Sequence, residues 1–463
     1  MSSPLKILGG GMAGLSTGYF AQKYGIPFTI YEADEQVGGN TKTFQHGDFR
    51  FDSGAHRFHD KDPLMTRELK LLLGDDLTEI HAPSQIYHNG RFINFPLSPL
   101  NLMFRLGPVS FLGGALDVLR SRLKQSHKHQ HFESFAVQTY GKDIAKRFLL
   151  NYSEKLWGSS CENLSIDIAG KRLKGLDLRT FLVESFMGRS AATRHMERAS
   201  FYYPLGGIQC IPDRMAGVCD SRNIRCGARV TKVFHTETRL QAMELNHAEI
   251  VGLDRSEVVS TLPLPSFIQS LDPSPPEPLL EAARSLRFRS MVLVTHLLTK
   301  ESVTNNATVY FPDSNFPFTR IYEPRNRDHS LSPVGFTSLV AEIPCQQGDA
   351  VWEADRDELI DRVRIHLIRM GWIHEGEIMD ATIRRFSNAY PILERGYEEK
   401  VSRLNAYLSR FSNLKSEGRN AKFVYSWIHD MMRYGFEVVS SCHSGVSGQI
   451  CEPEVLSGEQ IHS

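Results

Sequence analysis

The sequence has no excess of charge of either sign and no long hydrophobic run. Its 463 residues carry 53 Lys and Arg against 53 Asp and Glu, so the formal net charge is zero. No global field therefore draws nucleic acid or an anionic membrane to the chain. The longest weakly charged stretch, 92–119, contains Arg105, Asp117, three prolines and several glycines, which argues against a membrane-spanning helix. Contact of this stretch with a membrane surface is an alternative that we do not favour.

The chain is also poor in cysteine. Its seven cysteines form no C-x-x-C pair and are odd in number, which supports neither a disulfide framework nor a zinc site. We expect no metal site. Residues 1–4 precede the first expected strand and show no signal-peptide pattern. These observations predict a protein of the cytoplasm, a reducing compartment.

What the sequence does have is the composition of an ordinary α/β protein, with 41% hydrophobic and 23% charged residues. Its length predicts two or three domains. The opening segment carries the most information. Residues 5–8 predict a short buried strand, residues 9–14 read G-G-G-M-A-G, and residues 15–23 predict a helix.

This order of strand, G-x-G-x-x-G and helix is typical of a dinucleotide-binding fold. Gly9 makes the tight turn, Gly11 lets the backbone approach a pyrophosphate, and Gly14 lets the helix pack on the strand. The anion then lies at the positive end of the helix. A second expected strand, 28–31, ends at Glu32, whose carboxylate suits ribose hydroxyls. These features together favour a bound dinucleotide over a glycine-rich turn without ligand.

The residues after Glu32 point to one dinucleotide. Residues 33–39 place acidic side chains before the doublet Gly38-Gly39, and this stretch resembles the flavoenzymes with two dinucleotide-binding domains. The resemblance implies an α/β fold in which a Rossmann-like FAD domain carries an inserted α+β substrate domain, and it implies FAD as cofactor. The expected FAD contacts are Gly9, Gly11, Met12, Ala13, Gly14, Glu32, Gly38, Gly39, Asn40, Val230, Gly418 and Arg419.

Later segments resemble one group within this superfamily, the amine oxidases, protoporphyrinogen oxidases and UDP-galactopyranose mutases. Residues 51–59, F-D-S-G-A-H-R-F-H, are similar to the mutase segment G-P-H-x-F-H, with Ala55 in place of proline. By this resemblance His56 and His59 are candidate catalytic residues that hydrogen-bond the flavin or polarise a substrate. The alternative is that each is a structural histidine.

Candidate substrate contacts come from three further segments. Residues 152–158, Y-S-E-K-L-W-G, are similar to the mutase segment Y-T-x-K-x-W-G. They place Trp157 beside Lys155, a combination that suits a flat ligand, and plain core packing is the alternative. The basic run 171–198 contributes Arg172, and a Y-P-x-G-G stretch contributes Tyr203.

Arg320 is the strongest candidate for anchoring the substrate. Residues 316–323 resemble the mutase P-Y-T-R-I-x-E, whose arginine contacts the substrate diphosphate. A guanidinium offers a planar fork that matches phosphate or carboxylate oxygens, so we expect Arg320 to bind substrate and to take part in catalysis. The alternative is a surface ion pair with Glu323.

The order of these segments divides the chain into two discontinuous domains. We expect residues 1–75, 201–262 and 385–445 to form the FAD-binding domain and residues 76–200 and 263–384 to form the substrate domain. Residues 446–463 are rich in Ser, Gly and Glu and predict a disordered tail. His429 falls where relatives often carry Asp, so the contact at the flavin edge stays open.

Two functions fit this reading. The first is an FAD-dependent oxidoreductase of the amine oxidase and protoporphyrinogen oxidase group, in which a small-molecule substrate transfers a hydride to flavin N5. The second is an isomerase similar to UDP-galactopyranose mutase, which uses reduced FAD on a nucleotide sugar without net redox change. We favour the oxidoreductase because it is the broader class. The substrate, the electron acceptor and the oligomeric state are not predicted.

Overall fold

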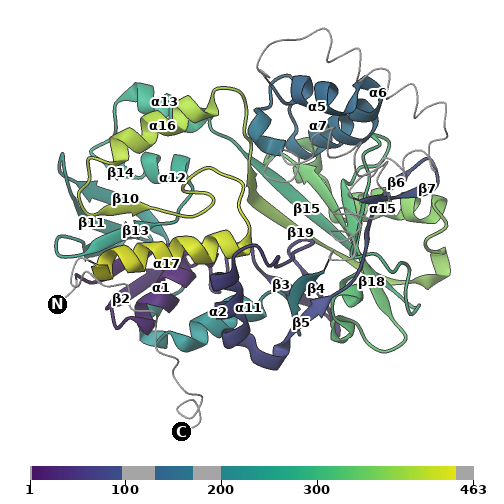
Figure 1. Ribbon diagram of the computed structural model, residues 1–463, viewed down its shortest axis with the longest axis horizontal. Coiled ribbons are helices and arrows are strands. Elements are labelled where there is room, and N and C mark those ends of the chain that lie inside the picture. Colours follow the sequence, from purple (N-terminus) through teal and green to yellow (C-terminus); the bar gives the residue numbers. More distant parts are fainter. Residues whose placement is uncertain (1–2, 96–130, 170–199, 445–463) are drawn as a thin grey trace, which may run out of the picture.

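A five-stranded parallel sheet forms one end of the molecule (Figure 1). The computed structural model describes residues 3–95, 131–169 and 200–444. Every pair of neighbouring strands in this sheet runs parallel. In spatial order the strands are β20 (Leu414–Ser416), β13 (Glu257–Ser260), β1 (Leu5–Leu8), β2 (Phe28–Tyr31) and β9 (Ile224–Arg225).

Alternate residues of this sheet face two different cores, as the strand repeat of two residues requires. Ile7 and Val259 pack with four helices on one face, and Leu8 and Val258 pack with the elements on the other. Helices and a second sheet cover both faces, and the strand side chains that pack into these two cores are apolar. The four helices are α1 (Met12–Lys23), α2 (Pro63–Leu73), α11 (Cys210–Val218) and α17 (Ile428–Ser444).

A four-stranded sheet and three helices cover the second face. β10 (Val230–His235) pairs with β11 (Leu240–Leu245) and with β14 (Leu271–Asp272), and β11 pairs with β12 (Glu249–Gly252). After β13 the chain therefore stays on this face of the parallel sheet, through β14 and the helix that follows it. The helices are α12 (Leu264–Gln269), α13 (Glu277–Ser285) and α16 (Tyr397–Leu408).

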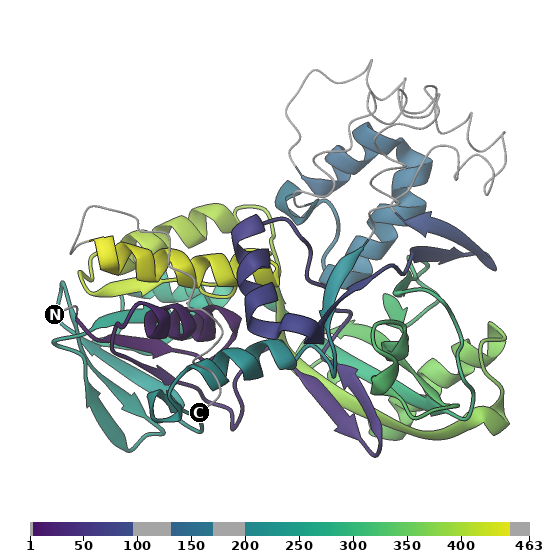
Figure 2. The same ribbon diagram turned by 60° about the horizontal axis from the view of Figure 1, so that its bottom comes forward.

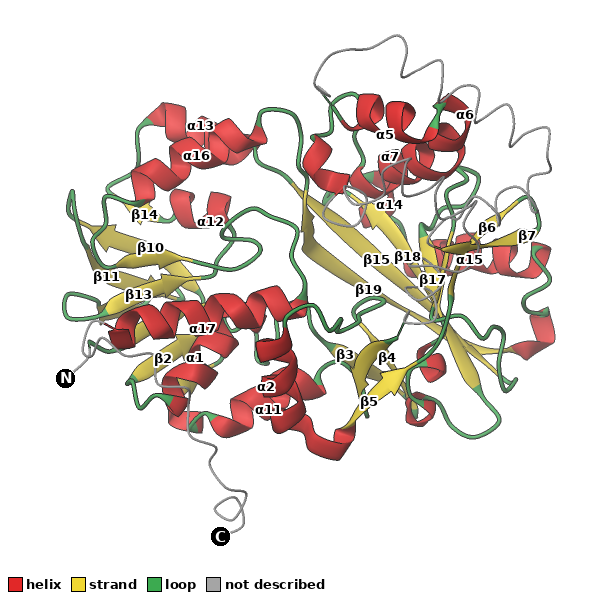
Figure 3. Cartoon of the chain, in the orientation of Figure 1, coloured by secondary structure: helices red, strands yellow, loops and turns green. Residues whose placement is uncertain are grey.

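A seven-stranded mixed sheet forms the other end of the molecule (Figure 3). Two of its three long strands, β15 (Phe288–Leu298) and β18 (Thr337–Cys345), are buried along their whole length. Helix α15 (Arg356–Arg369) packs on it through an apolar stripe. In spatial order the strands are β19 (Ile378–Pro391), β15 (Phe288–Leu298), β18 (Thr337–Cys345), β17 (Arg320–Tyr322), β16 (Thr308–Tyr310), β6 (Ser84–His88) and β7 (Arg91–Phe95).

A small group of helices and two antiparallel strand pairs complete the described chain. The helices α5 (Phe132–Tyr140), α6 (Lys142–Ile144) and α7 (Asn151–Trp157) lie beside the seven-stranded sheet (Figure 2). The remaining strand pairs are β3 (Thr43–His46) with β4 (Phe49–Asp52) and β5 (Leu77–Ile80) with β8 (Phe201–Pro204). Short helix α14 (Ala350–Glu353) precedes α15.

The α/β class and the Rossmann-like parallel sheet are confirmed. The division into two domains stays a prediction, and β19 runs across the boundary expected at residue 385. Arg172, the tail 446–463 and all but residues 92–95 of the stretch 92–119 lie outside the described residues. Within the described ranges, every helix is too short or too polar to cross a membrane.

Candidate active site

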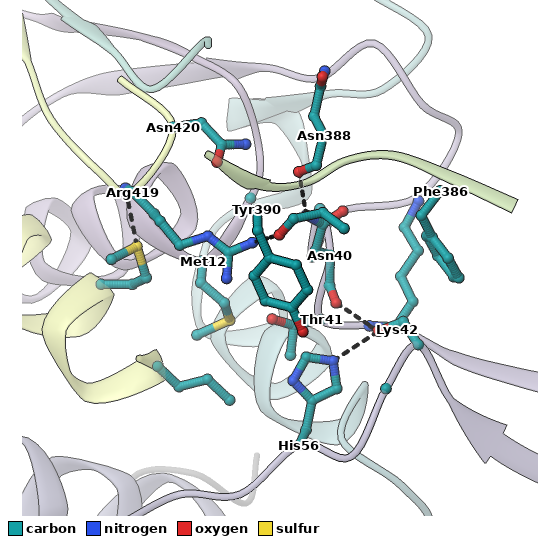
Figure 4. Close-up of a pocket in the computed structure, with 18 of the residues that line it drawn as sticks. Met12, Asn40, Thr41, Lys42, His56, Phe386, Asn388, Tyr390, Arg419 and Asn420 are labelled. Atoms are coloured by element: carbon teal, nitrogen blue, oxygen red, sulfur yellow. Dashed lines mark hydrogen bonds between the residues drawn. The ribbon is translucent and has the colours of Figure 1, made fainter. Parts of the chain in front are cut away.

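A cavity of about 640 Å³ opens between the two large sheets. On one side it is lined by the residues that follow β1 and β13, among them Gly9, Met12 and Thr261. The carboxyl ends of neighbouring parallel strands whose connections leave in opposite directions are the usual ligand site of such sheets. On the other side it is lined by residues of the seven-stranded sheet, including Arg320 and Tyr390. Figure 4 shows Met12, His56, Tyr390 and Arg419 around the same space.

The glycine loop after β1 has the backbone geometry that the sequence predicts. Gly9 has a φ of +98°, which disfavours any side chain. A Cβ on Gly14 would overlap the carbonyl oxygen of Gly9, so only glycine allows α1 to lie this close to β1. A Cβ on Gly11, in contrast, would touch only the Cα of Gly39, at 3.8 Å. The backbone at Gly11 is therefore open to the cavity.

The carboxylate of Glu32 lies at the end of β2 and lines the cavity. Its Oε2 accepts a hydrogen bond from the Gly10 N–H over 2.6 Å, and its Oε1 accepts one from the Asp34 N–H over 2.9 Å. The two bonds fix the carboxylate against the glycine loop. This places an acceptor where the sequence predicts contact with a ribose.

Four more of the predicted cofactor contacts lie around the middle of the cavity: Gly38, Gly39, Gly418 and Arg419. The Gly38 N–H donates to the Gly10 carbonyl over 2.9 Å, so the doublet is tied to the glycine loop. Gly418 has a φ of +102°, and a Cβ there would lie 2.8 Å from the Cβ of Ala13. The guanidinium of Arg419 donates to the carbonyl of Ala389.

His56 is held in one orientation by a short chain of hydrogen bonds. Its Nε2 lies 2.9 Å from Ser53 Oγ, and that hydroxyl donates to the Asn40 carbonyl over 2.5 Å (Figure 4). Because the single hydroxyl proton is used, His56 Nε2 is the donor in its pair with Ser53. Burial, together with the nearby charges of Arg320 and Arg419, lowers the pKa of His56 to about 3. The ring is therefore neutral, with Nδ1 as an acceptor.

His59 also lines the cavity, but it lies among aromatic rings. Its ring centre is 6.1 Å from that of Trp427 and 6.4 Å from that of Phe201, both edge to face. Asn40, another predicted contact, donates from its side chain to the Asn388 carbonyl over 3.1 Å. Both residues are thus at the cavity wall, as are Met12 and Ala13.

Arg320 reaches the cavity from β17, and two side chains hold it there. Its Nε donates to Glu342 Oε2 over 2.5 Å, and its Nη2 donates to the Tyr390 hydroxyl over 3.0 Å. The other oxygen of Glu342 accepts the Ala55 N–H over 2.9 Å. Burial alone would lower the pKa of Arg320, but the adjacent Glu342 carboxylate outweighs it and raises the pKa, so the guanidinium stays charged.

The alternative pairing of Arg320 with Glu323 is wrong. Glu323 is fully buried. Its side chain points to the face opposite that of Arg320, because side chains alternate along an extended chain and the two residues are three apart. Its carboxylate accepts the Val303 and Thr304 N–H groups and the Thr337 hydroxyl. The partner of Arg320, Glu342, lies directly opposite it on β18.

Besides Gly14, which lies in α1, three predicted site residues are absent from the described residues that line the cavity. Tyr203 is 0% exposed and donates to Asp52 over 2.6 Å, which leaves no surface for a substrate. Trp157 is buried, and its ring packs edge to face on Tyr390 and Tyr425. It therefore lies behind the aromatic wall. Val230, at the start of β10, is partly buried and packs against the core on the second face of the parallel sheet.

Sequence reasoning missed several residues of the wall. Tyr390 and Tyr425 both line the cavity and stack with ring centres 6.0 Å apart. Burial raises the pKa of Tyr390 to about 12, so it is a neutral donor and acceptor. No local sequence signal marks Glu342 or Ser53. The partner of Glu342 lies on another strand, and His56, the partner of Ser53, lies in the turn that follows it.

The cavity wall carries more positive than negative side chains. Six are cationic: Lys42, Arg57, Arg320, Arg384, Arg385 and Arg419. Three are carboxylates: Glu32, Asp34 and Glu342. Two of the cations are neutralised by ion pairs, Lys42 with Asp34 over 2.6 Å and Arg320 with Glu342. The remaining excess of positive charge favours anionic groups in the cavity.

The parallel sheet, the glycine loop and the cavity define a dinucleotide-binding protein, and comparison with known proteins places it more closely. The sequence model of one family, described as flavin containing amine oxidoreductase, matches residues 12–391. The chain belongs to this family. Among curated proteins, the mitochondrial protoporphyrinogen oxidase of Nicotiana tabacum is 22% identical over 266 residues, which are 51% of this chain and 52% of the tobacco protein. The chain thus matches about half the length of that relative.

Two solved structures share the fold along nearly the whole chain. A reduced UDP-galactopyranose mutase matches with a TM-score of 0.84 and 17% identity, over 96% of each chain. A putative protoporphyrinogen oxidase from Exiguobacterium sp. 255-15 matches with a TM-score of 0.74 and 16% identity, over 95% of this chain and 98% of that chain. The resemblance inferred from the motifs is confirmed.

FAD is the cofactor of this chain, and the cavity fits it. The backbone at Gly11 is open where a pyrophosphate would approach, at the positive end of α1. Glu32 offers an acceptor at the next strand end. The cavity continues without a break from these residues to Arg320, so it has room for an extended ligand.

Proposed function

We propose that the chain is an FAD-dependent oxidoreductase in which a small substrate with an anionic group transfers a hydride to flavin N5. The observation that carries this proposal is the single cavity that joins the glycine loop to the guanidinium of Arg320. When bound, FAD supplies the hydride acceptor. The protein's own part is to bind and orient the two partners in that cavity.

The residues that would hold FAD are those at the loop and the strand ends. The backbone from Gly11 to Ala13 would bind the pyrophosphate, and Glu32 would accept hydrogen bonds from the ribose. Gly38, Gly39 and Gly418 leave room for the cofactor because they add no side chain to the wall. Gly9 and Gly14 act indirectly by shaping the turn, and Val230 lacks support from the geometry.

Arg320 would anchor the anionic group of the substrate. Its guanidinium is held by Glu342 and Tyr390, so little side-chain freedom is lost when a ligand binds. The arginine excess of the wall also disfavours a cationic amine as substrate. Neutral His56 would accept a hydrogen bond at Nδ1 and so orient a hydroxyl or N–H group; its low pKa makes it a poor base.

A second candidate is a non-redox isomerase acting on a nucleotide sugar, as UDP-galactopyranose mutase does. The observation that favours it is an arginine at the wall beside stacked Tyr390 and Tyr425, a combination that suits a diphosphate joined to flat and sugar rings. In both cases the partner is a small molecule. A location in the cytoplasm stays a prediction.

Anaerobic incubation of the fully reduced protein with UDP-galactopyranose separates the two functions. Conversion to the furanose isomer would establish the isomerase and contradict the oxidoreductase. Absence of conversion would establish the oxidoreductase if, in a separate aerobic incubation, a carboxylate- or phosphate-bearing substrate reduces the flavin of the oxidised protein and dioxygen reoxidises it with release of hydrogen peroxide.

The role of Arg320 is tested by Arg320→Ala in the FAD-loaded protein. We expect the affinity for UDP, used as an anionic probe, to fall about tenfold to a hundredfold, the loss typical of a charge-assisted hydrogen bond. The flavin absorbance should stay unchanged. Arg287→Ala is the control, because Arg287 forms an exposed ion pair with Glu394. Equal loss of FAD and UDP would mean that Arg320 has only a structural role.

A further inference from the structure

The side-chain amine of Lys155 is surrounded by four backbone carbonyls. Helix α7 directs it into the connection between β16 and β17, where its Nζ donates to the carbonyls of Phe311, Asp313, Phe316 and Phe318 over 2.6, 2.7, 3.2 and 2.9 Å. Burial lowers the pKa of this amine to about 7, so below that pH it is an ammonium, whose three N–H groups the four acceptors share. All four acceptors belong to one connection of the chain.

These four hydrogen bonds attach both ends of the connection to a single atom, Lys155 Nζ. Phe311 follows β16, and Phe318 lies two residues before Arg320, the first residue of β17. In the β16–β17 pair, Arg320 lies directly opposite Tyr310, and both line the cavity. Whatever fixes residues 311–318 therefore also fixes the strand pair that carries Arg320.

The other side of the connection is held differently. Phe311 and Phe318 are buried and pack against each other with ring centres 4.8 Å apart, and Phe316 packs on His366 of α15. Apolar packing does not select one backbone orientation by itself, whereas hydrogen bonds to four carbonyls do. Tyr152, one turn before Lys155 on α7, also packs on Tyr310, with ring centres 5.9 Å apart.

We propose that Lys155 is a positioning residue for Arg320: by binding the 311–318 carbonyls it holds the β16–β17 pair at α7 and so aims the guanidinium into the cavity. Lys155 is absent from the residues that line the cavity, so it acts through Arg320 and does not itself bind a ligand. The effect of this guanidinium orientation on ligand binding rests on the proposed function. The effect of Lys155 on the backbone of residues 311–318 does not.

Hydrogen–deuterium exchange of the FAD-loaded protein tests the backbone part. In Lys155→Met, four carbonyls lose their donor, and we expect the amides of residues 311–322 to exchange at least ten times faster while those of residues 5–23 keep their rate. Lys146→Met is the matched control, because Lys146 is exposed just before α7. Unchanged exchange in residues 311–322, or an equal rise throughout the chain, would overturn the proposal.

Chemical rescue keeps the test decisive if the methionine variant folds poorly. In Lys155→Ala, ethylammonium supplies N–H donors in the vacated volume and should restore slow exchange of residues 311–322. Tetramethylammonium carries the same charge without N–H groups and should not. Equal rescue by the two cations, or by neither, contradicts a role through hydrogen bonds to the carbonyls.

The link to Arg320 is tested by a double-mutant cycle with UDP as the probe. Lys155→Met should lower UDP affinity about tenfold in the wild-type background and have no effect in the Arg320→Ala background. Additive losses would show that Lys155 acts independently of Arg320 and would overturn the proposal. If the wild-type protein does not bind UDP, the proposed anion site fails, and the exchange experiments still decide the role of Lys155 in the backbone.

Discussion

At the scale of single residues, the site depends on groups whose charge state is set by their surroundings. Arg320 is kept charged by Glu342, and His56 is kept neutral by burial and by nearby arginines. The protein therefore offers a fixed cation and a neutral acceptor within one cavity. Both properties can be tested without knowing the substrate.

Stability should depend on pH through His56. Its folded-state pKa of about 3 lies below the ordinary value of 6.5, so between these values the unfolded chain binds a proton that the folded chain does not. The free energy of unfolding therefore falls as the pH falls from about 6.5 towards 3, by at most about 1.4 kcal/mol per pH unit. Urea unfolding of FAD-free His56→Gln should show a shallower dependence. His81→Gln, at an exposed position, is the control and should match the wild-type protein.

FAD binding should depend on the absence of a side chain at residue 11. In Gly11→Val the added methyl groups occupy the open space in front of the loop, so the purified protein should lose its absorbance near 450 nm. The fold should persist, because the Cβ meets only Gly39 at 3.8 Å. Gly217→Val, in the open on α11, should remain yellow. A yellow Gly11→Val protein would contradict the assigned cradle.

How much of the site the sequence reveals depends on how far apart the interacting residues are. The strand 5–8, the glycines and Glu32 lie within one local unit, and their spacing alone predicted their arrangement. The partner of Arg320 is set by the register of β17 on β18, 22 residues away. No local pattern distinguishes Glu342 from Glu323. Likewise, the four carbonyls around Lys155 come from a connection about 160 residues later.

At the scale of elements, the close crossing of α17 over α1 supports the cavity. Met431 of α17 and Met12 of α1 both line it. A Cβ on Gly435 would lie 2.6 Å from backbone atoms of Ser16 and Thr17. Only glycine lets the two helices approach this closely, and the sequence gives no sign of it, because a lone glycine in a helix has no spacing pattern.

Gly435→Ala should therefore destabilise the fold. The added methyl group must push α17 away from α1, and overpacking of this kind costs about 1–3 kcal/mol. Urea unfolding measures the loss. Gly217→Ala on α11 is the matched control, because its Cβ meets nothing within 4 Å and alanine favours a helix. If both variants were equally stable, the crossing would be looser than the structure indicates.

At the scale of the whole molecule, the cavity wall draws on both large sheets. Gly11 and Glu32 come from the parallel end, and Arg320 and Tyr390 come from the seven-stranded end. A ligand that fills the cavity contacts both ends, so its binding energy stabilises both. A ligand that fills only the part of the cavity at the glycine loop should stabilise only the end that contains the parallel sheet.

FAD and ADP should therefore protect the FAD-free protein differently. At a concentration one hundred times its Kd, either ligand adds about 2.7 kcal/mol to the stability of the states that bind it. We expect hydrogen–deuterium exchange to slow in residues 5–31 with both ligands and in residues 320–345 with FAD alone. Equal protection of residues 320–345 by ADP would mean that the two ends are coupled through the protein and not through the flavin half of the cofactor.

The cavity also depends on residues far apart in order of synthesis. Its glycine loop is synthesised some 400 residues before Gly418, Arg419 and Met431. A nascent chain that has not yet exposed α17 lacks one wall of the pocket. The complete cofactor site therefore forms only after α17 has been synthesised, and a shortage of FAD would act on chains that already extend beyond that helix.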